Sequence, residues 1–246
     1  SGGGRATMPP LMQSGDIDGL AFIGGSRAAD DLIRKHPHPH RLKLFLQLEA
    51  KNMAVFLPSV FKAEHTALLD TSLDESIVGS LSFNGQRCTA LKIFFVPRDS
   101  AATFVDKFVQ KVDSLFVGLP WETDENGGVP TVTPLPNMKR VNYMKELIED
   151  AVSKGAKIMN KDGGKIIGGS DSTLMVPAVL YPVTKECKLY YEEQFGPVIP
   201  IVPYDDIDSC IEYGRDGEYG QQVAIFTSDE NSDTASGLLD KFSTVF

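Results

Sequence analysis

Short apolar runs alternate with amphipathic segments along most of the chain. Residues 18–26 (DGLAFIGGS) predict a short buried strand that ends at a glycine turn, and residues 27–36 predict the following helix. Residues 41–60 contain two apolar strands separated by the polar sequence EAKN. Apolar positions in residues 71–83 have helical spacing, and residues 91–97 (LKIFFVP) form a strand-like run.

The same alternation continues through the second half. Residues 100–118 predict an amphipathic helix with Phe104, Phe108, Val112 and Leu115 on one face, and the Pro- and Gly-rich residues 120–137 predict a loop. Residues 139–159 predict a helix that stops at Gly155 and continues into a strand. This pattern is typical of an α/β domain with a largely parallel sheet.

Composition restricts the class of protein. The 246 residues suffice for one large domain or two modest ones, and a net charge of −9 argues against nucleic acid or an anionic membrane as the main partner. No apolar run approaches the roughly 20 residues of a membrane span. Three cysteines without a CxxC motif predict neither a disulfide framework nor a zinc site, and they favour a reducing compartment such as the cytoplasm. The HPHPH sequence at 36–40 is expected to be a solvated linker rather than a metal site.

The two ends of the sequence give a separate expectation. The chain starts at Ser1 without a methionine and stops at KFSTVF, inside an apparent strand. Natural proteins seldom end within a strand, so we expect this chain to be a piece of a longer protein.

The turn FNGQRCTA places a thiol beside a cation. Asn84 and Gly85 permit a tight turn, and Arg87 precedes Cys88. A neighbouring positive charge favours the thiolate, and backbone N–H groups in a tight turn can hold an oxyanion. A small buried hydrophobe is the alternative role for Cys88.

Three further places could carry chemistry. Glu193 and Phe195, in YYEEQFGPV, can hold a carboxylate and a ring at a pocket edge, although an acidic pair can also be a solvated loop. Glu49 is either a general base or a solvated loop carboxylate. Gly24 and Gly25 are weak evidence for a phosphate-binding turn.

In this order, the motifs FIGGS, FNGQRCTA, YYEEQFGPV and YGQQVAIFT resemble the aldehyde dehydrogenase superfamily over nearly the whole chain. Within it, the chain is most similar to the NADP-dependent, non-phosphorylating glyceraldehyde-3-phosphate dehydrogenases. This resemblance implies that Cys88 attacks the aldehyde, that Glu193 and Phe195 hold the nicotinamide ribose and ring, and that Gly24 and Gly25 contact the cofactor. It also implies that Arg87 contacts a substrate phosphate.

One motif departs from the family pattern. The usual LELGGK is LQLEAK here, so an ungapped alignment puts Gln47 at the general-base position and Glu49 at a glycine position. A glutamine cannot accept a proton at neutral pH, so thioester hydrolysis is expected to be slow. Glu49 takes over this role only if the chain shifts by two residues.

We therefore expect residues 1–46 to be the C-terminal part of a Rossmann-type cofactor-binding domain. Residues 47–246 are expected to be an incomplete catalytic domain of three α/β/α layers. The implied reaction oxidises glyceraldehyde 3-phosphate to 3-phosphoglycerate and reduces NADP (or NAD), in a homo-oligomer of two or four subunits. A dehydrogenase of another aldehyde or semialdehyde, and a catalytically degenerate structural subunit, are the alternatives. The chain alone is not expected to bind cofactor well or to be active.

Overall fold

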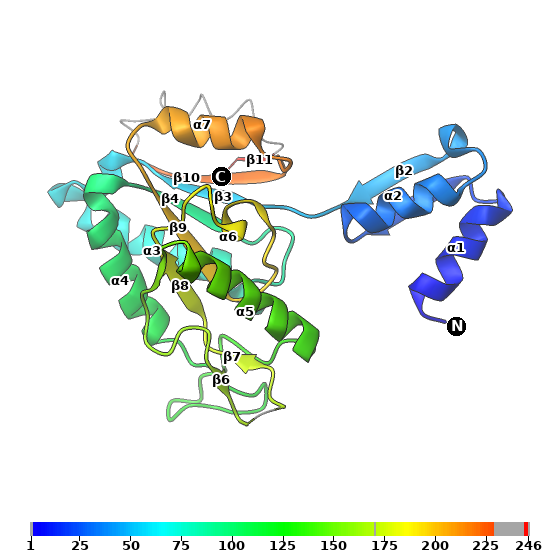
Figure 1. The fold of residues 1–246 in the computed structure, drawn as a ribbon. Helices are drawn as coiled ribbons and strands as arrows, with labels where there is room; N and C mark the ends of the chain where they lie inside the picture. Colours follow the sequence, from blue (N-terminus) through cyan, green and yellow to red (C-terminus); the bar gives the residue numbers. More distant parts are fainter. Residues whose placement is uncertain (1, 170, 229–243, 246) are drawn as a thin grey trace. The chain divides into compact units, whose positions relative to one another are not determined.

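The chain forms two compact units. The computed structural model describes residues 2–169, 171–228 and 244–245. Unit 1 is Ser1–Glu49 and unit 2 is Ala50–Phe246 (Figure 1). The boundary lies three residues after the predicted boundary at 46/47.

Unit 1 is a βαβ unit preceded by a helix. Its elements are α1 (Gly4–Ser14), β1 (Gly19–Ile23), α2 (Ser26–Lys35), a 3₁₀ turn (Pro39–Arg41) and β2 (Lys43–Gln47). The two strands are parallel, and Ile23 pairs with Gln47 at their carboxyl ends. A small core of Met12, Leu20, Leu32 and Leu42 joins the helices to this sheet. The helix after β1 therefore starts at the carboxyl edge of the strand pair.

Two expectations for unit 1 were wrong. In β1 only Leu20 is buried, whereas Ile23 at its end is 82% exposed, because a two-stranded sheet with so small a core cannot cover both of its faces. The predicted solvated linker at 36–40 includes the buried His36. Its Nε2 lies 3.0 Å from the carbonyl oxygen of Ile17, and its Nδ1 accepts a hydrogen bond from the His38 N–H.

Unit 2 is built on a seven-stranded sheet in its described residues, with the order β11-β10-β3-β4-β9-β8-β5. All neighbours are parallel except β5 and β8. The strands are β3 (Met53–Phe56), β4 (Ile93–Pro97), β5 (Lys157–Ile158), β8 (Ala178–Tyr181), β9 (Val198–Tyr204), β10 (Gln222–Phe226) and β11 (Thr244–Val245). Of the strand expected in KFSTVF, only Thr244 and Val245 lie within the described residues.

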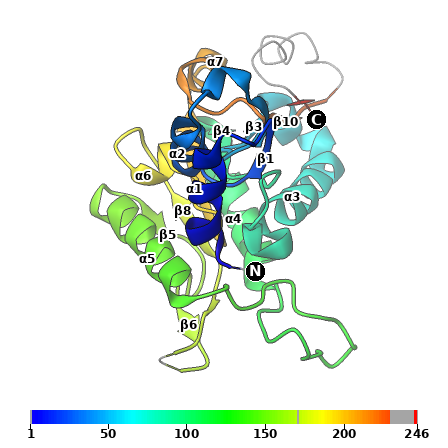
Figure 2. The ribbon, with the colours of Figure 1, turned by 90° about the vertical axis from the view of Figure 1, so that its right-hand side faces the viewer.

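Helices cover both faces of this sheet, so the predicted three layers are confirmed. Alternate residues of β3 enter different cores: Val55 packs with residues of α5, α6 and α7, and Phe56 packs with residues of α3 and α4. Figure 2 shows α5 and α3 on opposite sides of the sheet. The helices are α3 (Thr66–Leu81), α4 (Ala101–Asp113), α5 (Met138–Ser153), α6 (Lys188–Tyr191) and α7 (Ile207–Asp216).

Most predicted elements are present with small changes at their ends. Helix α3 begins at Thr66, five residues before the predicted start, after the short 3₁₀ turns Pro58–Phe61 and Ala63–His65. In α4 the predicted apolar face is confirmed by the buried Phe104, Phe108 and Val112. A small antiparallel pair, β6 (Ile166–Ile167) and β7 (Leu174–Met175), was not expected.

A strained turn connects α3 to the segment before β4. Phe83, Asn84 and Gly85 have φ values of 52°, 60° and 68°, which is the left-handed region. Asn84 Oδ1 accepts a hydrogen bond of 2.8 Å from the Thr133 N–H, which fixes the turn to a distant loop. Such strain persists only where the surrounding structure determines it, and it is frequent at functional sites.

Gly85→Ala tests how rigidly this turn is held. A Cβ at Gly85 would lie 2.8 Å from the backbone oxygens of both Ser80 and Gly196, whereas a Cβ at Gly127, also at positive φ, meets nothing within 4 Å. We expect Gly85→Ala to lower the free energy of unfolding by about 2–4 kcal/mol, and Gly127→Ala by about 1 kcal/mol. Urea unfolding measures both, and equal losses would show that the turn relaxes freely.

Candidate active site

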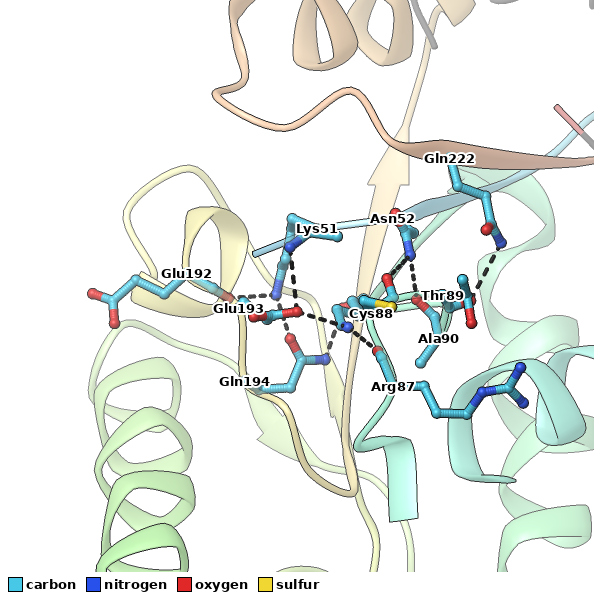
Figure 3. Close-up of polar contacts among 12 residues, drawn as sticks. Lys51, Asn52, Arg87, Cys88, Thr89, Ala90, Glu192, Glu193, Gln194 and Gln222 are labelled. Atoms are coloured by element: carbon cyan, nitrogen blue, oxygen red, sulfur yellow. Dashed lines mark hydrogen bonds and ion pairs between the residues drawn. The ribbon is translucent and has the colours of Figure 1, made fainter. Parts of the chain in front are cut away.

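The candidate site of unit 2 lies at the amino ends of four neighbouring strands. Asn52 precedes β3, Lys92 precedes β4, Gln194 lies four residues before β9, and Gln222 begins β10. Since β10, β3, β4 and β9 are adjacent and parallel, the segments that lead into them meet at one edge of the sheet. Figure 3 shows these segments around Cys88.

Amide side chains hold the backbone around Cys88 in place. Asn52 Nδ2 donates to the carbonyl oxygens of Cys88 at 2.6 Å and Ala90 at 3.0 Å. Gln222 Nε2 donates to the carbonyl oxygen of Thr89 at 3.3 Å. These hydrogen bonds connect the backbone of residues 88–90 to the segments at β3 and β10. They use the backbone carbonyl oxygens and do not involve the Cys88 thiol. Cys88 is partly exposed, whereas Cys187 and Cys210 are buried.

The cation beside the thiol was expected to be Arg87, and the structure places that side chain elsewhere. The exposed Arg87 donates from Nη1 to Ser82 Oγ at 3.1 Å and lies over the Phe83 ring. In Figure 3 its guanidinium points away from Cys88. The buried ammonium of Lys92 donates instead to the carbonyl oxygen of Arg87, the residue before Cys88. Lys92 is therefore a cation bound to the backbone of the turn that carries the thiol.

Lys92 belongs to a buried polar network that ends at Glu193. The Lys92 ammonium lies 2.8 Å from Glu193 Oε1, with 1% and 11% of the two side chains exposed. Glu193 Oε1 also accepts a hydrogen bond of 3.3 Å from the Ala50 N–H. This carboxylate therefore links the segments that precede β3, β4 and β9.

A second buried lysine lies in the same network. Lys51 Nζ donates to the Glu192 carbonyl oxygen at 2.8 Å and to Gln194 Oε1 at 2.7 Å. The Gln194 amide in turn donates to the carbonyl oxygens of Lys92 at 2.9 Å and Val198 at 2.7 Å. Each buried donor here has an acceptor, as buried charged groups require.

Burial controls how these lysines ionise. Loss of solvation is the main cause that holds the pKa of Lys51 well below its ordinary value, and the charge of Lys92 lowers it further. Burial also lowers the pKa of Lys92, against the opposing effect of the Glu193 carboxylate. Burial thus makes the charged form of both lysines less stable than it is in water.

Glu193 and Phe195 both contact the ammonium of Lys92. Phe195 has a φ of 46°, and its ring centroid lies 5.2 Å from Lys92 Nζ and 5.8 Å from Arg140 Cζ. Glu192 is separate, because its carboxylate accepts a hydrogen bond of 2.8 Å from the Tyr143 hydroxyl. An aromatic ring and a carboxylate side by side fit the ring and the ribose hydroxyls of a nicotinamide nucleoside.

The remaining predicted site residues, Gly24, Gly25, Gln47 and Glu49, are in unit 1. Gln47 ends β2, and its carbonyl oxygen accepts a hydrogen bond of 3.1 Å from the Gly24 N–H. Glu49 Oε2 accepts 2.7 Å hydrogen bonds from both the N–H and the hydroxyl of Ser26, the first residue of α2. The Glu49 carboxylate is thus committed to the amino end of α2.

This capping role makes Glu49 a poor general base. Partial burial opposes ionisation, but the hydrogen bonds from Ser26 outweigh it and lower the pKa of the Glu49 carboxyl. A general base near neutral pH needs a raised pKa. The ungapped alignment, which puts Gln47 at the general-base position, stays a prediction.

The residues of unit 1 fit a dinucleotide only in part. Gly24 and Gly25 form the turn between β1 and the amino end of α2, a position where α/β proteins bind phosphate. Glu49 already uses the Ser26 donors there, so a phosphate can take this place only after the carboxylate leaves. Among the described residues, no group of His, Cys, Asp and Glu side chains is placed to hold a metal ion, and no helix is long and apolar enough to cross a membrane.

Sequence reasoning missed Lys51, Asn52, Lys92 and Gln194. Lys92 stood within the predicted strand 91–97, and a lysine at the entrance to an otherwise apolar strand is itself a signal of a buried ion pair. Lys51 and Asn52 were placed in a polar separator, where nothing in the sequence indicates burial.

The chain is similar to known proteins over most of its length. Residues 1–239 match the model of the aldehyde dehydrogenase family. The NADP-dependent glyceraldehyde-3-phosphate dehydrogenase of Streptococcus equinus is 32% identical over 75% of this chain. The 3-sulfolactaldehyde dehydrogenase of Priestia aryabhattai is 29% identical over 89% of it.

Solved structures have the same fold. The NADP-dependent glyceraldehyde-3-phosphate dehydrogenase from Bacillus halodurans C-125, complexed with NADP, superposes with a TM-score of 0.84 at 28% identity and covers all of this chain. The present chain spans 47% of that protein, and 35% and 42% of the two curated relatives. It thus matches less than half the length of each.

The exposure of the cysteines predicts their reactivity. Cys187 and Cys210 are 1% and 0% exposed, and burial raises the pKa of Cys210 to about 12. We expect iodoacetamide at neutral pH to label Cys88 at least about tenfold faster than either of the others. Peptide mass spectrometry of a labelling time course measures the three rates, with the urea-unfolded chain as the control. Equal rates in the folded chain would contradict the assignment of Cys88 as the reactive thiol.

Proposed function

Because the chain belongs to the aldehyde dehydrogenase family, we propose that its unit 2 carries the catalytic centre of an aldehyde oxidation. Cys88 is the nucleophile of this proposal. The observation that carries it is the position of Cys88, which is partly exposed at the amino ends of β3 and β4, in a turn whose backbone carbonyls accept hydrogen bonds from Asn52, Gln222 and the buried Lys92. The Cys88 thiolate attacks the aldehyde carbon to form a thiohemiacetal, and loss of hydride converts this adduct to a thioester. A bound nicotinamide would supply the hydride acceptor.

The proposed substrate is an aldehyde that carries an anionic group, and glyceraldehyde 3-phosphate is the specific candidate. Arg87 has an exposed guanidinium that can grip a phosphate with two hydrogen bonds, provided that it turns from Ser82 toward the substrate. The names of two relatives specify a phosphorylated and a sulfonated aldehyde, which share this anionic character. The proposed product is 3-phosphoglycerate.

NADP is the cofactor of this proposal, as in the relative from Bacillus halodurans whose structure contains it. Glu193 and Phe195 in unit 2 would hold its ribose and nicotinamide ring, and Gly24 and Gly25 in unit 1 would approach its phosphates. We further propose a cytoplasmic location, since the three cysteines form no disulfide. A homo-oligomer of two or four subunits remains part of the same proposal.

Formation of the acyl-enzyme tests the proposed function directly. A longer protein that contains this chain, together with the parts that its relatives have beyond it, is incubated with glyceraldehyde 3-phosphate and NADP, quenched in acid and digested. We expect mass spectrometry to find the added acyl group on the Cys88 peptide, together with NADPH in solution. Acylation should be lost in Cys88→Ser and retained in Cys210→Ser. Absence of both the adduct and NADPH with every aldehyde tried would favour the alternative of a degenerate, structural subunit.

Arg87→Leu tests the choice of substrate. Loss of a charge-assisted contact worth about 1.5–3 kcal/mol should raise the concentration of glyceraldehyde 3-phosphate that half-protects Cys88 from iodoacetamide by about 10- to 100-fold. Protection by propionaldehyde should change little. Arg215→Leu is the control, because that exposed arginine pairs only with its neighbour Asp216 in the contacts described. If both aldehydes weaken equally, Arg87 supports the turn rather than the substrate.

Gln47 determines the fate of the thioester in this proposal. With no carboxylate to activate water, NADPH should appear as a burst of about one equivalent per site, followed by slow turnover. Gln47→Glu should speed the slow phase and leave the burst unchanged, as stopped-flow absorbance can show. Steady turnover without a burst, abolished by Glu49→Gln, would instead identify Glu49 as the base.

A further inference from the structure

The amino end of α2 is built like a phosphate site but holds a carboxylate. In the β1–α2–β2 unit, α2 begins beyond the carboxyl end of β1, after Gly24 and Gly25. Helix amino ends in this position offer unpaired N–H donors and a positive dipole to a nucleotide phosphate. Both features favour any anion, including one supplied by the chain itself.

Glu49 supplies that anion through close contacts. Its Oε2 takes the Ser26 N–H and the Ser26 hydroxyl, each at 2.7 Å. A Cβ at Gly25 would lie only 2.8 Å from Glu49 Oε1, so the glycine makes room for the carboxylate. The lowered pKa of Glu49 is consistent with a charge stabilised by these donors. Gly25 therefore leaves space for the Glu49 carboxylate, and Ser26 supplies its two hydrogen-bond donors.

We propose that Glu49 is an internal competitor that occupies the phosphate-binding end of α2 and must leave before a dinucleotide phosphate can bind there. This inference rests on the proposed function, since it assumes a dinucleotide as the ligand of unit 1. Two anions cannot share the Ser26 N–H and hydroxyl, and their charges repel at hydrogen-bonding distance. The capping equilibrium of Glu49 thus reduces the apparent affinity for the phosphate group.

The size of the effect follows from the strength of the cap. A side-chain cap contributes about 1 kcal/mol, with a range of about 0.5–2 kcal/mol. Removing the competitor should therefore tighten phosphate binding by about fivefold, and by up to about thirtyfold. Glu49→Ala removes the carboxylate, whereas Glu49→Gln keeps an acceptor of the same shape without the charge.

Inorganic pyrophosphate is the probe, because it presents the phosphate chemistry without requiring the remainder of a nucleotide site. It is titrated into the wild-type chain and its variants while the backbone amide resonances of Ser26 and Arg27 are followed by NMR. We expect the dissociation constant to fall by about fivefold or more in Glu49→Ala, and less in Glu49→Gln. Asp16→Ala is the matched control: it removes one exposed carboxylate of unit 1 that precedes the amino end of β1, and it should leave the constant unchanged.

Three results would overturn the inference. The first is that pyrophosphate shifts these amides equally in wild type and Glu49→Ala, the second is that it shifts them in neither, and the third is that it binds more tightly to Asp16→Ala by the same factor. Dispersed amide resonances for residues of β1 and β2 in each variant show that unit 1 remains folded, and Glu49→Gln serves if Glu49→Ala does not. Acylation of Cys88 is measured separately in unit 2, so failure of the proposed function and failure of this inference give different results.

Discussion

The buried ion pair between Lys92 and Glu193 is the interaction on which the site depends. Strand β4 is buried along its whole length, so a lysine at its entrance can remain charged only with a partner beside it. Glu193 is that partner, although it lies about a hundred residues later in the chain. Glu193 Oε1 also accepts a hydrogen bond from the Ala50 N–H. This one carboxylate therefore holds together the segments that lead into β3, β4 and β9. The thiol of Cys88 is positioned by the same edge of the sheet.

This pair also explains why the site lies at the amino ends of the strands. Ligands of open parallel sheets usually bind beyond the carboxyl ends. In unit 2, however, the segments that precede β3, β4 and β9 carry the charged side chains, and the strained turn at Phe83–Gly85 feeds into one of them. The side-chain amides of Asn52 and Gln194 donate hydrogen bonds to the backbone carbonyl oxygens of these segments. The arrangement is costly in buried polar groups, and one of them, Asn52 Oδ1, is buried without a hydrogen-bond partner.

Hydrophobic periodicity predicted the layers of unit 2 because every major strand and helix there has one or two faces in a large core. Val55 and Phe56 enter opposite cores, as the apolar run in β3 requires. The same reasoning failed in β1 and at His36, where the core of unit 1 is too small for apolar character to decide burial. The sequence was enough to name Cys88, Glu193 and Phe195 as candidate site residues, because each lies in a motif of consecutive residues. The direction of the Arg87 side chain and the burial of Lys51 depend on contacts distant in sequence, which no local pattern contains.

The two departures from the family pattern in LQLEAK, at Gln47 and Glu49, both concern the position of a carboxylate. Gln47 removes a carboxylate from the end of β2, and Glu49, two residues later, adds one that turns to the amino end of α2. Net charge in the segment is therefore the same as in the usual LELGGK, but the negative charge has moved from a position suited to activating water to one suited to capping a helix. A carboxylate with a lowered pKa is held in place by Ser26, and it is correspondingly weak as a proton acceptor. In the proposed function the two substitutions act in the same direction: Gln47 would slow release of an acyl group from Cys88, and Glu49 would obstruct a phosphate of the hydride acceptor.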